Sequence, residues 1–374
     1  MLNSPEFRAS AADQLAAAAS RVPSLTAFIG LDGFVDEILH VVDKRHDAVR
    51  FDRVPTIAAY AARLAAAAGQ STNVELVNIM TKLGGNGPIM ANALARFGIG
   101  VTYLGALGWP ALHPVFDEFA TRAEVHTLCG AGLTDALEFD DGKVMVGKHY
   151  TLKEINWANI TARYGKEKFA AKLASSDLVG FVNWTMLPYM SDIWESIQEE
   201  LVPAISGPRQ KIFFDLADPE KRLPADIARA LDLIVRFQSK FDCILGLNEK
   251  EAHEVAKVLG IPSGPRGWEG LAELSLEIQK HVPVDTLVVH PTTYALAVSG
   301  GKAEVVAGSV CAKPKITTGA GDHFNSGFCL GKLLGLGNAA SLLCGVGTSG
   351  HYVRTADSPG VADLVAFMRS WPSN

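Results

Sequence analysis

The stretch Ile316–Gly327 joins an acid to glycines at the start of a predicted helix, reading Ile-Thr-Thr-Gly-Ala-Gly-Asp-His-Phe-Asn-Ser-Gly. Gly319 and Gly321 remove side-chain bulk where an apolar helical pattern begins, so backbone N–H groups can point outward there. Such a helix start attracts anions, including phosphate groups. Asp322 lies in the first turn, where it is predicted either to cap the helix or to accept a proton in catalysis. The residues alone leave these two interpretations equally open.

Two further acids follow the first predicted strand, Leu25–Ile29. Asp32 and Asp36 lie where this apolar run ends, and the carboxyl ends of strands in open α/β sheets face the ligand crevice. Taken alone, these positions favour a turn acid at Asp32 and a solvent-facing Asp36 over substrate contacts.

A second glycine turn, Gly84-Gly85-Asn86-Gly87, joins a predicted strand at Val74–Leu83 to a predicted helix at Pro88–Phe97. Its glycines faintly match a dinucleotide-binding fingerprint, which requires an acid for the ribose about twenty residues further on. The segment Val101–Leu107 contains no acid. A dinucleotide oxidoreductase is therefore only the third hypothesis.

Short apolar runs alternate with helical stretches from Asp177 onward, which predicts a parallel sheet covered on both faces. These runs are Leu178–Val182, Lys211–Asp215, Cys243–Leu247 and Thr286–Val289. A hairpin is predicted between Thr134 and Gly147 around Asp-Asp-Gly-Lys. Together with Ile38–Phe51 it is expected to form a small antiparallel sheet over the site. A second hairpin joins Tyr294–Val298 to Ala303–Ala307.

The composition describes a globular protein with a large core. The 374 residues carry 34 Lys and Arg against 40 Asp and Glu, a net charge of −6, which argues against a nucleic-acid surface. No apolar run reaches the roughly 18 residues of a membrane helix, and the start lacks the features of an export signal, so a cytoplasmic location is expected. The five cysteines form no Cys-x-x-Cys pair and are predicted to be buried thiols.

Two of these motifs resemble the signatures of a known family. Thr-Gly-Ala-Gly-Asp followed by x-Phe-Asn resembles the C-terminal signature of the ribokinase (PfkB) family of small-molecule kinases, and Gly84–Gly98 resembles its N-terminal signature. The resemblance implies an α/β fold of the three-layer α/β/α, ribokinase-like type, with a mostly parallel central sheet and a small antiparallel β lid. It further implies a single kinase domain over 1–374, with lid segments within about 36–52 and 134–150.

The resemblance also implies a reaction, in which ATP phosphorylates a hydroxymethyl group of a sugar or sugar-like molecule with the help of Mg²⁺. A nucleoside kinase of the same family is the alternative. No Gly-x4-Gly-Lys-Ser/Thr occurs, which excludes a Walker-type phosphate loop. A homodimer through the open edge of the lid is expected as well, because exposed strand edges are commonly paired or covered.

Roles follow from the resemblance position by position. Asp322 is the implied base, with the amides of Gly319, Ala320 and Gly321 as the anion hole. The implied acceptor-binding residues are Asp32, Asp36, Gly84, Gly85, Asn86 and Asn183, and the implied nucleotide-binding residues are Asn248, His290, Thr292, Thr318 and Asn325. Asn248-Glu249-Lys250-Glu251 resembles the family's Asn-x-x-Glu motif, which implies that Glu251 acts on Mg²⁺ through water. Read alone, these four residues would be a solvated helix cap.

The sequence departs from the family pattern at three places. Thr317 stands where the family often has Asp, and Ile89 falls where an acceptor-binding Asn is expected. The glycine-containing turn beside the purine is replaced by His290–Ala295, so the choice of nucleotide is open, and a non-catalytic ligand-binding protein of the same fold is the second hypothesis. His323 points about 100° away from Asp322 on a helix and is predicted to be a helix-face residue.

Overall fold

The central sheet has nine strands and is mostly parallel. The structure, a computed structural model, describes residues 1–372. Across the sheet the strands are β14 (Lys302–Ala307), β13 (Tyr294–Ser299), β12 (Thr286–Val289), β11 (Phe241–Leu247), β10 (Gln210–Asp215), β9 (Leu178–Phe181), β1 (Thr26–Leu31), β5 (Gly100–Gly105) and β6 (Glu124–Thr127). All strands from β12 to β6 run parallel, and β13 is antiparallel to both of its neighbours. The predicted mostly parallel sheet is confirmed.

Helices cover both faces of this sheet and enclose two large apolar clusters. One face carries α5 (Trp157–Arg163), α6 (Lys166–Ser175), α7 (Met190–Glu200), α8 (Pro224–Phe237), α9 (Glu249–Val258) and α10 (Trp268–His281). The other carries α1 (Pro5–Ala18), α3 (Asn86–Phe97), the short α4 (Asp117–Ala120), α11 (Ala320–Leu333), α12 (Asn338–Thr355) and α13 (Val361–Ser370). Short 3₁₀ turns lie at Ala19–Ser24, Pro114–Phe116, Tyr150–Glu154, Val202–Ala204 and Pro219–Lys221. The layers give the expected α/β/α arrangement.

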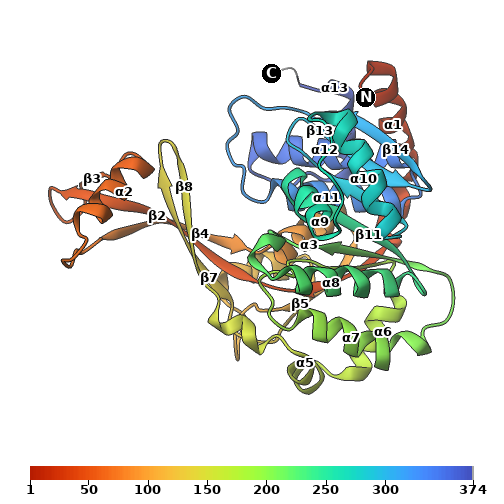
Figure 1. Ribbon diagram of the computed structural model, residues 1–374, viewed down its shortest axis with the longest axis horizontal. Helices are drawn as coiled ribbons and strands as arrows, with labels where there is room; N and C mark the ends of the chain where they lie inside the picture. The colour runs from red at the N-terminus through yellow and green to blue at the C-terminus, as the bar shows by residue number, and fades with distance from the viewer. Residues whose placement is uncertain (373–374) are drawn as a thin grey trace.

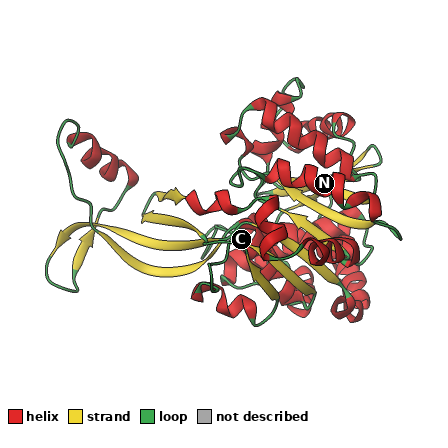
Figure 2. Cartoon of the chain, turned by 90° about the horizontal axis from the view of Figure 1, so that it is seen from below, coloured by secondary structure: helices red, strands yellow, loops and turns green. Residues whose placement is uncertain are grey.

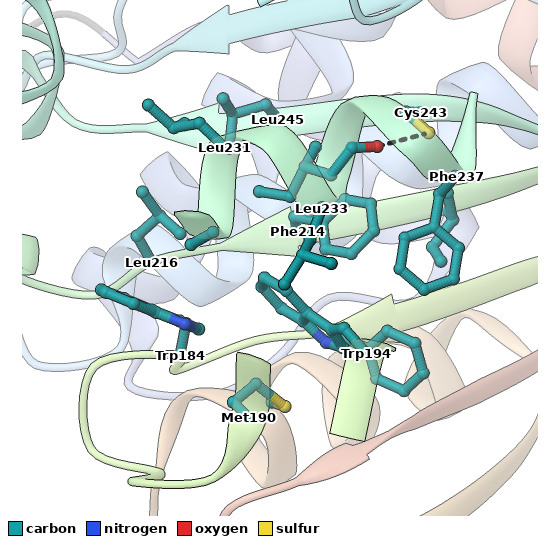
Figure 3. Packing of buried hydrophobic residues seen from close by; sticks show 14 of the residues in the cluster. Trp184, Met190, Trp194, Phe214, Leu216, Leu231, Leu233, Phe237, Cys243 and Leu245 are labelled. Carbon is teal, nitrogen blue, oxygen red and sulfur yellow. Dashed lines mark hydrogen bonds between the residues drawn. The ribbon is translucent and has the colours of Figure 1, made fainter. Parts of the chain in front are cut away.

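Aromatic packing holds α7 and α8 on the sheet (Figure 3). Phe214 of β10 packs edge to face on Trp194 of α7, with ring centroids 5.1 Å apart, and its centroid lies 5.5 Å from that of Phe237 of α8. Such pairs are worth about 0.5–1.5 kcal/mol beyond the burial of their area. The carboxyl end of β10 is thereby fixed, and with it the residues that follow the strand.

A second sheet projects from the body as a long lid (Figures 1 and 2). It consists of β2 (Phe34–Arg45), β3 (Phe51–Arg53), β4 (Leu76–Gly84), β7 (Gly132–Phe139) and β8 (Gly142–Lys148), with α2 (Ile57–Ala66) over its outer end. The strand predicted at Val74–Leu83 belongs to this lid and pairs with β2, outside the central sheet. The lid is antiparallel except for the parallel pairing of β2 with β7.

The lid is therefore larger than the two predicted segments, 36–52 and 134–150. The single kinase domain over 1–374, with the lid as part of it, stays a prediction, and residues 373–374 lie outside the described part of the chain. Across residues 1–372, every helix is too short or too polar to span a lipid bilayer.

Candidate active site

The glycine stretch forms a tight turn that leads into α11. Gly319 has φ 90° and ψ 0°, the values of the third residue of a type II turn, which favours glycine. The amide of Ala320 closes this turn by donating to the carbonyl of Thr317 at 3.1 Å. Within residues 1–372, the amides of Gly319 and Gly321 have no acceptor. Of the three amides expected to form an anion hole, that of Ala320 is engaged in the turn, and those of Gly319 and Gly321 are available.

Asp322 is the third residue of α11 and points into a cavity. Gly319 is the residue that caps the helix, so Asp322 is not its N-cap. The Asp322 side chain is 7 % exposed, and its Oδ1 accepts a hydrogen bond from Asn86 Nδ2 at 3.0 Å. Burial, and then the negative charge of Asp215, hold the pKa of Asp322 well above its usual value. The carboxylate is therefore a stronger base than an exposed aspartate.

Two cavities lie on either side of the start of α11. One has a volume of about 400 Å³ and is lined by Asp36, Asn86, Asn183 and Asp322 among others. The second has a volume of about 460 Å³ and is lined by His290, Thr292, Ala320, Gly321 and Phe324 among others. Asn248 lines both. After the roles that the resemblance implies for their residues, we call the first the acceptor cavity and the second the nucleotide cavity. The glycine turn thus lies where two bound molecules would meet.

Asp36 enters the acceptor cavity from the lid. It lies opposite Lys82 of β4 and Thr134 of β7. Burial raises its pKa, while the positive charge of Lys82 opposes that shift. A side chain on Gly84 would place its Cβ 2.4 Å from the Asp36 carboxyl group, so glycine is required there to leave room for the acid. The exposed Asp36 favoured by the residues alone is wrong, because the lid buries it.

Asp32 does not line the acceptor cavity and is fully buried. Its carboxylate accepts hydrogen bonds from the amides of Asn86 (3.0 Å) and Gly87 (2.9 Å) and from Nδ2 of Asn183 (2.7 Å). Burial raises its pKa to about 6. The expected direct contact with an acceptor is not supported, because donors from the chain itself occupy both oxygens of the Asp32 carboxylate. Asp32 instead positions Gly85, the cap of α3, and the two asparagines beside the cavity.

Asn183 is oriented by this contact. Its amide nitrogen donates to Asp32, and within residues 1–372 its buried Oδ1 has no partner. The residue lines the acceptor cavity. The backbone of Asn183 is left-handed, with φ 60°, a conformation that asparagine tolerates better than most residues. An unpaired buried oxygen is costly unless a ligand pairs with it.

The expected nucleotide-binding residues do not all line the same cavity. His290 and Thr292 line the nucleotide cavity, and the His290 ring lies 4.7 Å from the Phe324 ring, centroid to centroid. Thr318 lines the acceptor cavity instead. Asn325 lines neither cavity, because it points toward the sheet and donates to Asp215 Oδ2 at 3.0 Å. A direct nucleotide contact is therefore not supported for Thr318 or Asn325.

Asn248 and Glu251 form a capping box at the start of α9. Glu251 Oε2 accepts from the Asn248 amide at 2.8 Å, and Asn248 Oδ1 accepts from the Glu251 amide at 3.0 Å. Glu251 Oε1 accepts from the Asp218 amide at 2.9 Å. Both residues also line the acceptor cavity. The helix cap is present, but Glu251 is buried and not solvated as the residues alone suggested. A role of Glu251 on a metal stays a prediction.

Asp215 is a buried acid near the site that the sequence analysis missed. It ends β10, and its Oδ1 accepts from the Ala217 amide at 2.8 Å. Burial, and then the charge of Glu251, raise its pKa well above the usual value. The signal was present, since an acid at the carboxyl end of a predicted strand is what singled out Asp36. Cavity-lining Met145, His149 and Lys221 carried no comparable signal.

A three-layer α/β/α fold, a lid over one cavity and a glycine turn at a helix start beside a buried aspartate are the features of the ribokinase-like class of small-molecule kinases. Arabidopsis thaliana ribokinase, solved with ribose and ATP, has the same fold, with a TM-score of 0.63 at 14% identity over 92% of this chain and 98% of that one. A carbohydrate kinase from Agrobacterium tumefaciens gives a TM-score of 0.61 at 16% identity, over 92% and 97%.

The sequence comparisons specify the family. The family model for prokaryotic ketohexokinase matches residues 8–371, and the chain belongs to that family. A ketohexokinase from Haloferax volcanii is 31% identical over 349 residues, which cover 93% of this chain and 92% of the relative. The protein is a carbohydrate kinase, which transfers a phosphoryl group from ATP to an alcohol group of a sugar or sugar-like acceptor.

Proposed function

We propose that the acceptor is a ketohexose and that one of its hydroxymethyl groups receives the γ-phosphoryl group of ATP. Family membership supports the ketohexose. The observation that carries the reaction is the placement of Asp322, which faces the acceptor cavity from the first turn of the helix whose start borders the nucleotide cavity.

In this proposal the side chains and amides of the site have different roles. Asp322 takes the proton of the attacking hydroxyl group, a role favoured by its raised pKa. Asp36, Asn86 and Asn183 line the acceptor cavity and bind other hydroxyl groups of the sugar. The amides of Gly319 and Gly321 stabilise charge on the transferred phosphoryl group.

Mg²⁺ fits this set of donors only as a water-bound ion. Within residues 1–372, no group of three or more metal-binding side chains comes together. Glu251 and Asp215 each use both oxygens within the chain, which suits carboxylates that hold Mg²⁺ through water while phosphates bind it directly. The ion would neutralise phosphate charge beside these buried acids. The requirement for Mg²⁺ is part of the proposal.

Two features of the whole protein complete the proposal. The lid carries exposed apolar side chains, among them Met80 and Met145, and a second copy of the chain is the expected partner that covers them. A cytoplasmic location stays a prediction from the sequence.

Release of ADP from MgATP tests the proposal, measured with a panel of ketohexoses, aldoses, pentoses and nucleosides. We expect turnover with a ketohexose to exceed that with every nucleoside. Preference for a nucleoside would support the alternative kinase. Calorimetry that shows sugar binding without ATP binding would contradict catalysis and support the non-catalytic ligand-binding protein. That hypothesis was suggested by the altered turn at His290–Ala295. Analysis of the product by NMR assigns the phosphorylated carbon.

A further inference from the structure

We propose that His323 and Tyr352 are positioning residues that hold the catalytic turn, Thr317–Ala320, with its free amide directed at the phosphoryl group. The inference rests on the proposed function and deepens it. Neither residue lines the acceptor cavity or the nucleotide cavity. Both lie behind the turn, beside a separate polar cavity of about 480 Å³.

The turn needs such support because glycine makes it ambiguous. Type I and type II turns differ mainly in the orientation of their central peptide, and glycine at the third position accepts either. In this turn the central peptide joins the Thr318 carbonyl to the Gly319 amide. Since a trans peptide points its C=O and N–H in opposite directions, fixing the Thr318 carbonyl fixes the Gly319 amide. A flipped peptide would direct a carbonyl oxygen at the phosphate.

Tyr352 fixes that central peptide. Its hydroxyl group donates to the Thr318 carbonyl at 2.9 Å. The tyrosine hydroxyl oxygen also lies 3.3 Å from the position that a Cβ on Gly319 would take. The tyrosine ring therefore supports the turn on the side away from the amide. A single hydroxyl hydrogen bond thus determines which group of the peptide faces the site.

His323 fixes both the next peptide and the tyrosine. Its Nδ1 lies 2.7 Å from the Gly319 carbonyl oxygen, and its ring stacks on the Tyr352 ring with centroids 3.6 Å apart and planes 13° apart. The Gly319 carbonyl belongs to the peptide whose N–H, on Ala320, closes the turn. The His323 amide also donates to this carbonyl, at 3.1 Å, so the imidazole adds a second and shorter contact to it. The same imidazole stacks on the tyrosine ring that holds the Thr318 carbonyl.

The contacts determine that Nδ1 of His323 carries a hydrogen. A carbonyl oxygen only accepts, so Nδ1 carries the hydrogen, and Nε2 accepts from the Ser358 hydroxyl group at 2.8 Å. Burial lowers the pKa of His323 to about 4, so the ring is neutral at pH 7. A neutral ring places no positive charge behind Asp322, where a cation would lower the pKa of the base.

Kinetics of single-group variants test the role. We expect Tyr352→Phe, which keeps the stacked ring, to lower kcat about two- to tenfold, the loss of one hydrogen bond. The KM values for sugar and MgATP should stay within about twofold, because the amide acts mainly on the transferring phosphoryl group. Tyr164→Phe is the matched control: its ring is buried on the opposite face of the sheet, in the other apolar cluster, and its kcat should not change.

Two variants of His323 and an NMR spectrum complete the test. His323→Asn keeps an N–H donor near the Gly319 carbonyl and should retain more of kcat than His323→Leu. In the wild-type enzyme at pH 7, ¹⁵N NMR should show His323 with its hydrogen on Nδ1. Wild-type kcat in both Tyr352→Phe and His323→Leu, or a hydrogen on Nε2, overturns the proposal.

The outcomes separate this inference from the proposed function. If the wild type phosphorylates a different class of acceptor, the variants are measured with that acceptor and the expected ratios are unchanged. If the wild type has no kinase activity, the proposed function fails, while the NMR spectrum still decides the hydrogen-bond arrangement. If His323→Leu does not fold, Tyr352→Phe and the spectrum carry the test.

Discussion

Asp322 is buried beside another acid, yet it must be ionised to accept a proton. Asp322→Asn keeps the size of the side chain and an oxygen to accept from Asn86, and it removes only the proton acceptor. We expect kcat to fall by at least about a hundredfold, while the affinities for sugar and nucleotide change by no more than a few fold. Steady-state kinetics and calorimetry measure the two quantities. Near-full turnover would falsify the role of Asp322 as base.

The same substitution changes the pH dependence of stability. The folded-state pKa of Asp322 is raised, so the folded protein releases this proton at higher pH than the unfolded chain. Stability is then lost as pH rises from the unfolded pKa to the folded pKa. We expect Asp322→Asn to melt at an equal or higher temperature than wild type at pH 8, with a smaller difference near pH 4.

A surface acid provides the control of opposite sign. The pKa of Asp47 is lowered, first by its hydrogen bond from the Arg50 amide, so its contribution to stability is present at neutral pH and lost on acidification. Asp47→Asn should therefore melt slightly lower than wild type at pH 8. A decrease in melting temperature for Asp322→Asn at pH 8 would contradict the expected cost of its buried charge.

At the scale of elements, Glu251 at the start of α9 has a structural role as a helix cap and a proposed role in ordering hydrated Mg²⁺. Glu251→Gln removes charge and one of the two acceptors of the capping arrangement, so stability should fall by about 1 kcal/mol. If Glu251 also orders hydrated Mg²⁺, the Mg²⁺ concentration for half-maximal rate should rise while the KM for sugar changes little.

Glu249→Gln is the matched control, because Glu249 is exposed in the same helical turn. It removes the same charge without touching the capping box, and the Mg²⁺ titration should be unchanged. An unchanged titration for Glu251→Gln as well would leave Glu251 as a capping residue alone.

The elements also show what the sequence can and cannot predict. Strands such as Leu178–Phe181 were predictable because burial on both faces gives a continuous apolar run. The alternating run of β4 predicted a strand but not its partner, since pairing with β2 is decided by contacts between distant segments. The burial of Asp36 was missed for the same reason, because the lid that covers it is such a pairing.

Within the site, residue type was easier to predict than the use of each polar atom. Asp32 and Asp36 follow the same strand, and the resemblance implied the same role for both. The Asp32 carboxylate accepts hydrogen bonds from amides at the start of α3, whereas Asp36 lines a cavity. The sequence indicates that an acid lies near the crevice. Which of its oxygens remain free for a ligand depends on where the start of α3 packs, and the sequence does not show this.

At the scale of the whole molecule, the lid exposes apolar side chains on the face that looks toward the site. Ile38 of β2 lies opposite Met80 of β4 and Ala136 of β7, and Ala136 lies opposite Met145 of β8, so these residues share that face. Ile38 and Ala136 are buried, whereas Met80 is 55 % and Met145 50 % exposed. The lid extends away from the body of the protein (Figure 2), and the exposure of Met80 and Met145 on it motivates the proposed dimer.

We therefore expect light scattering to show association of the wild type as concentration rises, and Met80→Glu to weaken it at least tenfold, because a charge would be buried without a partner. Val49→Glu is the control: Val49 is 82 % exposed in the loop between β2 and β3 at the lid tip, away from this face. It should associate like wild type. If wild type stays monomeric at every concentration, the lid serves the acceptor cavity alone. If Val49→Glu weakens association equally, net charge and not the Met80 face decides it.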